Sequence, residues 1–108
     1  MKQRQQLTAL LDQIQAEMQR LDLWGEVPPP PEAFTSELPF CVDTLEFHDW
    51  LRWVFVPRMR ALLDAGAPLP ARCALAPMAE EMFKDRPQHV VRLVAYLRAF
   101  DVAVTRSI

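Results

Sequence analysis

The sequence predicts an all-α protein, a compact four-helix bundle with a kinked central helix and a proline-rich connector. Apolar residues recur at helical spacing in several segments, and no segment shows the alternation of a strand. Most of the ten prolines fall between these segments, where they mark connections. A chain of 108 residues has the length of one domain, residues 1–108, and can bury about two-thirds of its unfolded surface.

The first helix is expected over residues 3–23. Its apolar residues follow a four-three-four-three spacing, namely Leu7, Leu11, Ile14, Met18 and Leu21. Gly25 is well placed to end this helix. The repeat spans only two heptads, which favours packing within the domain. The same face could also pair with a second copy in a homodimer.

The connector contains four consecutive prolines, Pro28 to Pro31, which cannot be helical because each ring fixes φ. A short polyproline II spacer between helices is the simplest interpretation. The alternative is a ligand for a proline-recognising domain.

The central helix is expected to begin near Asp43 or Thr44, both good capping residues, and to end at Gly66. Pro57 removes one backbone hydrogen bond and should kink the helix. Projected at 100° per residue, one broad apolar arc contains Phe47, Trp50, Leu51, Val54, Phe55, Ala61 and Leu62.

Two further helices follow. Pro77 opens a short one that runs to about Lys84. Asp85 and Pro87 then form a cap-plus-first-position signature for the last helix. The apolar stripe of that helix is Val90, Leu93, Val94, Leu97, Phe100 and Val104.

The run PFCVDTLEFHDWLRWVFVPRMRALLDAGAPLP and the later APMAEEMF resemble the YqcC-like family of small bacterial proteins of uncharacterised function. The most specific part is the pattern D-T-(x5)-W-L-x-W-V-(x2)-P-R-M, and the similarity covers nearly the whole chain. Arg52 stands where the family pattern commonly has glutamine. The resemblance implies an all-helical bundle. It also implies a possible partner, because family genes often lie beside one for a tRNA pseudouridine synthase.

Composition excludes several classes of function. A net charge of −2 and a pI near 5.6 argue against a general nucleic-acid binder, so no direct DNA binding is expected. The N-terminus lacks the apolar region of a signal peptide, and no apolar run is long enough to span a membrane. We therefore expect a cytoplasmic protein whose two cysteines, Cys41 and Cys73, stay reduced.

No catalytic constellation is found. His48 and His89 lie outside any metal-binding motif, so neither a metal site nor a cofactor is predicted. A pseudouridine synthase needs a catalytic aspartate in a basic cleft large enough for a flipped base. An all-helical chain of this size offers no such cleft, so we expect it not to be an enzyme.

Two charged residues fall inside apolar stripes. Arg58 lies on the arc of the central helix, and Asp101 lies on the stripe of the last helix. A buried arginine needs a partner, because an unpaired buried charge costs several kcal/mol. We expect Arg58 to pair with Asp101, or with Asp43 or Glu46, and thereby to fix the register of the helices. An anion or ligand contact is the alternative.

Trp53 lies outside the apolar arc, so it is either covered by the proline-rich connector or part of an exposed patch. Tryptophan and arginine dominate protein-binding hot spots. The leading hypothesis is therefore an interaction or accessory protein that binds a protein partner through Trp50, Arg52, Trp53 and Arg58. The alternative is a small-ligand binder with an apolar pocket between helices and Arg58 as its anchor.

Overall fold

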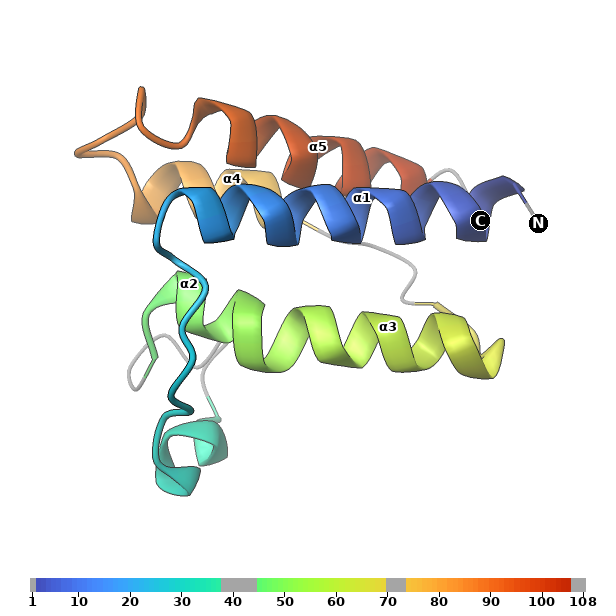
Figure 1. The fold of residues 1–108 in the computed structure, drawn as a ribbon, viewed down its shortest axis with the longest axis horizontal. Coiled ribbons are helices and arrows are strands. Elements are labelled where there is room, and N and C mark those ends of the chain that lie inside the picture. Colours follow the sequence, from blue (N-terminus) through green and yellow to red (C-terminus); the bar gives the residue numbers. More distant parts are fainter. Residues whose placement is uncertain (1, 38–44, 70–73, 106–108) are drawn as a thin grey trace.

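The computed structural model describes residues 2–37, 45–69 and 74–105 (Figure 1). Helix α1 spans Lys2–Arg20, and a short 3₁₀ helix, η1, spans Pro31–Thr35. The central segment consists of α2 (Phe47–Trp50), a π-helical turn η3 (Leu51–Phe55) and α3 (Val56–Ala65). Helices α4 (Leu75–Met82) and α5 (Val91–Thr105) follow. The described ranges contain helices, turns and irregular segments but no strand, and the all-α prediction is confirmed.

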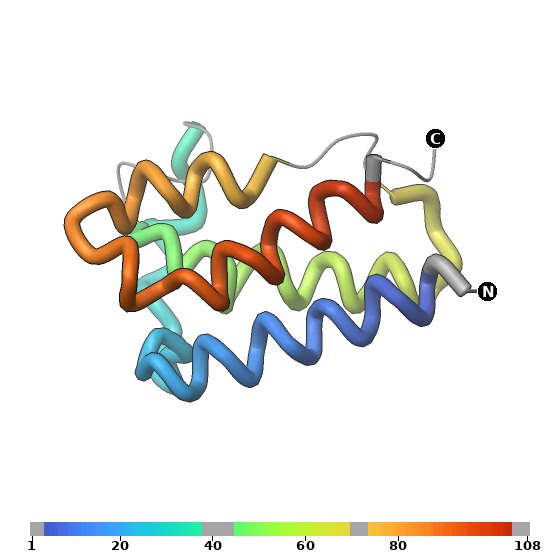
Figure 2. Tube along the Cα trace, turned by 90° about the horizontal axis from the view of Figure 1, so that it is seen from above, coloured from blue at the N-terminus to red at the C-terminus, as the bar shows by residue number. Residues whose placement is uncertain are grey.

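Helix α1 lies between the central segment and the last helix. It packs against α5 on one side and α3 on the other, while α4 packs against α5 (Figures 1 and 2). All five predicted apolar residues of α1 are buried, as is the whole predicted stripe of α5. The apolar face of α1 is therefore used inside the domain and is not available for pairing with a second copy.

Helices α1 and α3 are both followed by a residue in the left-handed conformation, but the residue type differs. Gly66 is left-handed, with φ of 65°, and Ala67 N donates to the carbonyl of Leu62 at 3.0 Å, as predicted for the end of α3. Helix α1 ends at Arg20, and the left-handed residue that follows it is Asp22, with φ of 60°. Leu23 N there donates to the carbonyl of Met18 at 2.8 Å. The predicted stop at Gly25 is therefore wrong, because aspartate can also adopt the left-handed conformation.

The connector is extended at Pro30, with φ of −60° and ψ of 149°, as expected for polyproline II. Pro31 instead opens the 3₁₀ helix η1, because a proline suits a first helical position. The spacer is thus one residue shorter than predicted.

The central segment begins at Phe47, and the predicted caps Asp43 and Thr44 lie outside the described residues. The sequence predicts a kink at Pro57, and the structure has a π turn directly before it. Val56 N donates to the carbonyl of Leu51, five residues earlier. Pro57 has no N–H, and its ring crowds the carbonyl four residues before it, so the helix widens there.

The π turn adds one residue to the helix and shifts the buried face of α3 by one position. After the turn, Val56 and Met59 are buried, whereas Arg58 and Ala61 are exposed. A projection at 100° per residue predicts the reverse, because it assumes an uninterrupted α-helix. The prediction that Arg58 faces the core is therefore wrong.

The last two helices are shorter than expected. Helix α4 ends at Met82 rather than near Lys84, and α5 begins at Val91 rather than at Pro87. Between them the chain makes successive turns, in which Arg86 N bonds the carbonyl of Phe83 at 2.8 Å. Proline can start a turn as readily as a helix, so the cap signature identified the region but not the first helical residue.

Candidate functional site

A chain of aromatic rings fixes the first half of the central segment on the core. Phe47 and Trp50 stack with centroids 6.2 Å apart, and Trp50 stacks on Phe55 at 5.7 Å. Phe55 in turn meets Phe100 of α5 edge-on at 5.3 Å. Such contacts add about 0.5–1.5 kcal/mol each beyond burial. Trp50, predicted to belong to a binding surface, is half-buried and packs on both phenylalanines.

Arg52 and Trp53 belong to a different cluster, which also contains Trp24. The guanidinium carbon of Arg52 lies 4.2 Å from the ring centroid of Trp24 and 4.0 Å from that of Trp53. Its Nε donates to the carbonyl of Gly25 at 3.1 Å. We call these three side chains the tryptophan–arginine stack. All three are half-buried, so the stack forms part of the surface.

Two irregular features place the stack. The left-handed turn at Asp22 redirects the chain after α1, so that Trp24 and Gly25 reach the central segment. Arg52 and Trp53 are neighbours in the sequence and lie within the π turn. Consecutive residues of an α-helix do not face each other, yet here the guanidinium of Arg52 lies over the indole of Trp53. No local sequence pattern indicates Trp24, because its role depends on both irregularities.

The indole nitrogen of Trp53 is buried, and no acceptor among the described residues bonds it. A Cβ atom built on Gly25 would lie 3.8 Å from this indole nitrogen. It would also lie 3.8 Å from Oδ1 of Asp49. A donor without an acceptor and a half-exposed carboxylate therefore converge beside Gly25. Leaving such a donor unpaired costs about 1–3 kcal/mol.

The predicted ion pair of Arg58 with Asp101 is wrong. Arg58 is exposed on α3. Asp101 is buried as expected, but its carboxylate accepts from Leu75 N at 3.0 Å and from Ala76 N at 2.9 Å. Asp101 of α5 thus caps the N-terminus of α4, where free N–H groups and the helix dipole favour a negative charge. The alternative partner Asp43 lies outside the described residues.

A second buried carboxylate, Glu17, is held within its own helix. Arg20 donates to both of its oxygens, from Nε at 2.9 Å and from Nη2 at 2.5 Å. These bonds hold the pKa of Glu17 below its usual range, although burial acts in the opposite direction. Arg92 and His89 add smaller favourable interactions that lower the pKa further.

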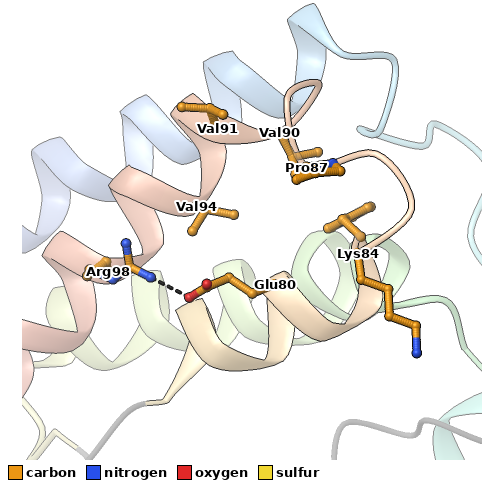
Figure 3. Close-up of a pocket in the computed structure, with 8 residues that line it drawn as sticks. Glu80, Lys84, Pro87, Val90, Val91, Val94 and Arg98 are labelled. Carbon is orange, nitrogen blue, oxygen red and sulfur yellow. Dashed lines mark hydrogen bonds and ion pairs between the residues drawn. The ribbon is translucent and has the colours of Figure 1, made fainter.

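An open groove of about 430 Å³ lies between α4 and α5 (Figure 3). Phe83, Pro87, Val90, Val91 and Val94 form its apolar wall. Arg98 binds Glu80 across it, and Lys84 lies at its rim (Figure 3). Arg58 does not line this groove, so the predicted combination of an apolar pocket with an Arg58 anchor is not formed there.

The described residues lack two kinds of feature. No cluster of three or more His, Cys, Asp or Glu side chains among them could hold a metal ion. None of the described helices has the length and apolar character needed to cross a membrane.

Comparison with known proteins places these features in a family. Residues 6–103 match the family model DUF446, described as tRNA pseudouridine synthase C. The chain is 37% identical over 98 residues to the uncharacterised protein YqcC of Escherichia coli, covering 83% of this chain and 89% of YqcC. It is 49% identical over 82 residues to an uncharacterised protein of Haemophilus influenzae, covering 76% and 77% of the two chains.

A third relative is much longer. The chain is 43% identical over 70 residues to a protein of Pectobacterium carotovorum named tRNA pseudouridine synthase C. That match covers 65% of this chain but only 19% of the Pectobacterium protein.

The solution structure of Escherichia coli YqcC has the same fold. It superposes with a TM-score of 0.87 at 33% sequence identity, covering 100% of this chain and 92% of YqcC. The sequence pattern around Trp50 and Trp53, the family model and this superposition agree, and the chain belongs to the YqcC-like family.

Proposed function

We propose that this chain is a non-enzymatic accessory protein that binds a tRNA pseudouridine synthase, with the tryptophan–arginine stack at the contact. The observation that carries the proposal is the Pectobacterium protein, in which a segment similar to this chain takes up 19% of a protein named tRNA pseudouridine synthase C. Covalent linkage keeps such a segment and the rest of the protein at high effective concentration. Where the accessory protein and the synthase are separate chains, as proposed here, a non-covalent contact has to replace that linkage.

The hydrogen bonds of the buried carboxylates support a non-catalytic role for this chain. Chemistry on a tRNA base needs a pocket for the flipped base and an acid that is free to act. Glu17 and Asp101 are the buried carboxylates of the described ranges, and both hold structural hydrogen bonds. Catalysis is therefore assigned to the partner.

The stack has the chemistry of a binding hot spot. Its guanidinium is held by two indole rings and the Gly25 carbonyl, so little side-chain freedom remains to be lost on binding. Tryptophan and arginine are the residue types that contribute most at interfaces.

Isothermal titration of the purified chain with purified tRNA pseudouridine synthase C from the same organism tests the proposal. We expect a complex that Arg52→Ala and Trp53→Phe each weaken by about tenfold or more, as for hot-spot residues. Trp53→Phe keeps an aromatic ring but removes the indole donor. Arg58→Ala is the matched control, because it removes the same charge from an exposed position on the same helical segment.

Three results would contradict the proposal. Absence of binding at about 100 μM, far above the dissociation constants of most specific complexes, would exclude the synthase as partner. Equal binding by Arg52→Ala and the wild type would exclude the stack. Formation of pseudouridine in tRNA by the chain alone would exclude a non-enzymatic role.

A further inference from the structure

The outer side of α5 carries a stripe of exposed residues, most of them apolar, on which no described helix packs fully. Val91 is 63% exposed and Val102 is 46% exposed, although both belong to the helix that forms the centre of the core. Ala95 and Arg98 lie between them and are also exposed. The spacing of four, three and four residues puts Val91, Ala95, Arg98 and Val102 along one side of the helix. We call these four residues the α5 outer stripe.

The stripe has a hollow at one end and a projection at the other. Val91 and Arg98 line the α4–α5 groove together with Pro87 (Figure 3). Val102 lies about one turn beyond Arg98, on the same side of α5 but outside the groove. A valine side chain is small enough to enter a groove of about 430 Å³.

We propose that the α5 outer stripe is a self-association surface, on which a second copy of this chain packs antiparallel about a two-fold axis. In a two-fold contact, every pair occurs twice: if one residue of the first copy contacts a second residue on the other copy, the second residue of the first copy contacts the first residue of the other. An axis midway between Ala95 and Arg98 places Val102 of each copy beside Val91 and the groove of the other. The same axis places Ala95 opposite Arg98 of the second copy, where a small side chain leaves room.

The charges along the groove suit contact with an identical surface. A two-fold axis near Arg98 brings this residue close to Arg98 of the second copy, which would repel it. Within each chain, however, Arg98 is bound by Glu80 on α4. Lys84 is likewise bound by Glu81, at 3.2 Å. The contact surface is therefore charge-balanced, and two copies can approach without net repulsion.

The area limits the strength of the association. A standard interface takes about a tenth of a small protein's surface from each partner. The chain exposes 6842 Å², and the proposed contact involves one side of one helix and one groove. Contacts at the low end of this range are transient, so we expect association in the high micromolar range.

Sedimentation equilibrium of the full chain from about 10 μM to about 1 mM tests the inference, the range being chosen to bracket a weak contact. We expect a monomer–dimer equilibrium that Val102→Asp weakens about tenfold or more, because it puts a charge into an apolar groove. Val27→Asp is the matched control. It introduces the same charge at a valine that is 84% exposed in the connector, and it should leave the equilibrium unchanged.

The charge arrangement gives a second test. Glu80→Gln leaves the two Arg98 side chains facing each other without their neutralising partners, so it should weaken dimerisation. Adding Arg98→Gln removes the repulsion and should restore it, which is a coupling that a double-mutant cycle measures. Circular dichroism of each variant checks that the helical fold is retained.

A monomer throughout the concentration range would overturn the inference, as would a dimer unaffected by Val102→Asp or a double variant that does not recover. If Val102→Asp weakens binding to the synthase while the chain stays monomeric, the stripe belongs to that partner and the second copy is excluded. Because dimerisation needs no synthase, failure of either proposal leaves the other standing.

Discussion

The start of α4 and the chain after α1 are each held by a charged side chain from another helical segment. The two charged side chains differ in their access to solvent. At the start of α4, Asp101 of α5 accepts two backbone N–H bonds in a buried position. After α1, the carbonyl of Gly25 accepts from Arg52 of the π turn, and that guanidinium lies half-buried between two indole rings. The first charge is enclosed by protein, whereas the second remains within reach of a partner.

The difference separates a structural charge from one that can serve recognition. A charge enclosed by its hydrogen-bond donors is strongly coupled to folding, because removing it leaves buried groups unpaired. A stacked guanidinium at the surface contributes less to folding. Substitutions at the two sites should therefore differ in whether they affect stability or binding.

Asp101→Ala has the largest expected effect. It removes the acceptors of Leu75 N and Ala76 N, so we expect the free energy of unfolding to fall by about 2–4 kcal/mol in urea denaturation. Asp101→Asn keeps one acceptor oxygen and should lose less. Asp85→Ala, at an exposed position in the turn before α5, is the control. Equal stability of Asp101→Ala and Asp85→Ala would show that the cap contributes nothing.

Glu17→Gln should have a smaller effect that depends on pH, because Glu17 is as buried as Asp101 but its donor lies in the same helix. Folding lowers the pKa of Glu17 from its ordinary value of 4.5, so the added stability is complete above that value. It is lost as the pH falls through the lower pKa of the folded state. Near neutral pH we expect a deficit of about 1 kcal/mol for Glu17→Gln.

Urea denaturation at several pH values tests this dependence. The difference between wild type and Glu17→Gln should narrow as the pH is lowered below 4.5. Glu81→Gln breaks an exposed pair with Lys84 and should change stability by less than about 0.5 kcal/mol. A difference for Glu17→Gln that widens in acid would reverse the assigned sign of the pKa shift.

Arg52→Ala should have the smallest effect on folding, a loss of about 0.5–1 kcal/mol from its contacts with the two rings. Tryptophan fluorescence should change, because Trp24 and Trp53 lose the cation between them. Arg58→Ala should leave both stability and fluorescence unchanged, since Arg58 is exposed. A loss above about 2 kcal/mol for Arg52→Ala would make the stack primarily structural and weaken the comparison with Asp101.

Local periodicity was sufficient to predict the parts of the fold built from regular helices. The stripes of α1 and α5 are buried as expected, because each follows directly from 3.6 residues per turn. The Gly66 stop was also predictable, since glycine favours the left-handed conformation that ends a helix. The apolar spacing and the glycine each act on the helix in which they lie or which they end.

The remaining features depend on irregular geometry or distant contacts. The π turn moves the buried position from Arg58 to Met59, and a fixed projection cannot detect one added residue. The apolar stripe predicts Asp101 as a buried charge, but its backbone partners lie 25 and 26 residues earlier in the chain. Trp24 joins Arg52 only because the chain leaves α1 by a left-handed turn at Asp22 rather than at Gly25.

The π turn also means that the central segment could lose one residue and keep the directions of its two flanks, provided that Pro57 is replaced as well. Deleting one residue from an α-helix rotates everything after it by about 100° and exposes what was buried. Deleting one residue from Leu51–Phe55 would instead let an ordinary helix connect α2 to α3 with both flanks facing as they do now, once Pro57 no longer blocks it. Relatives one residue shorter at this point could therefore keep Met59 in the core, although they would lose the geometry that places Arg52 over Trp53.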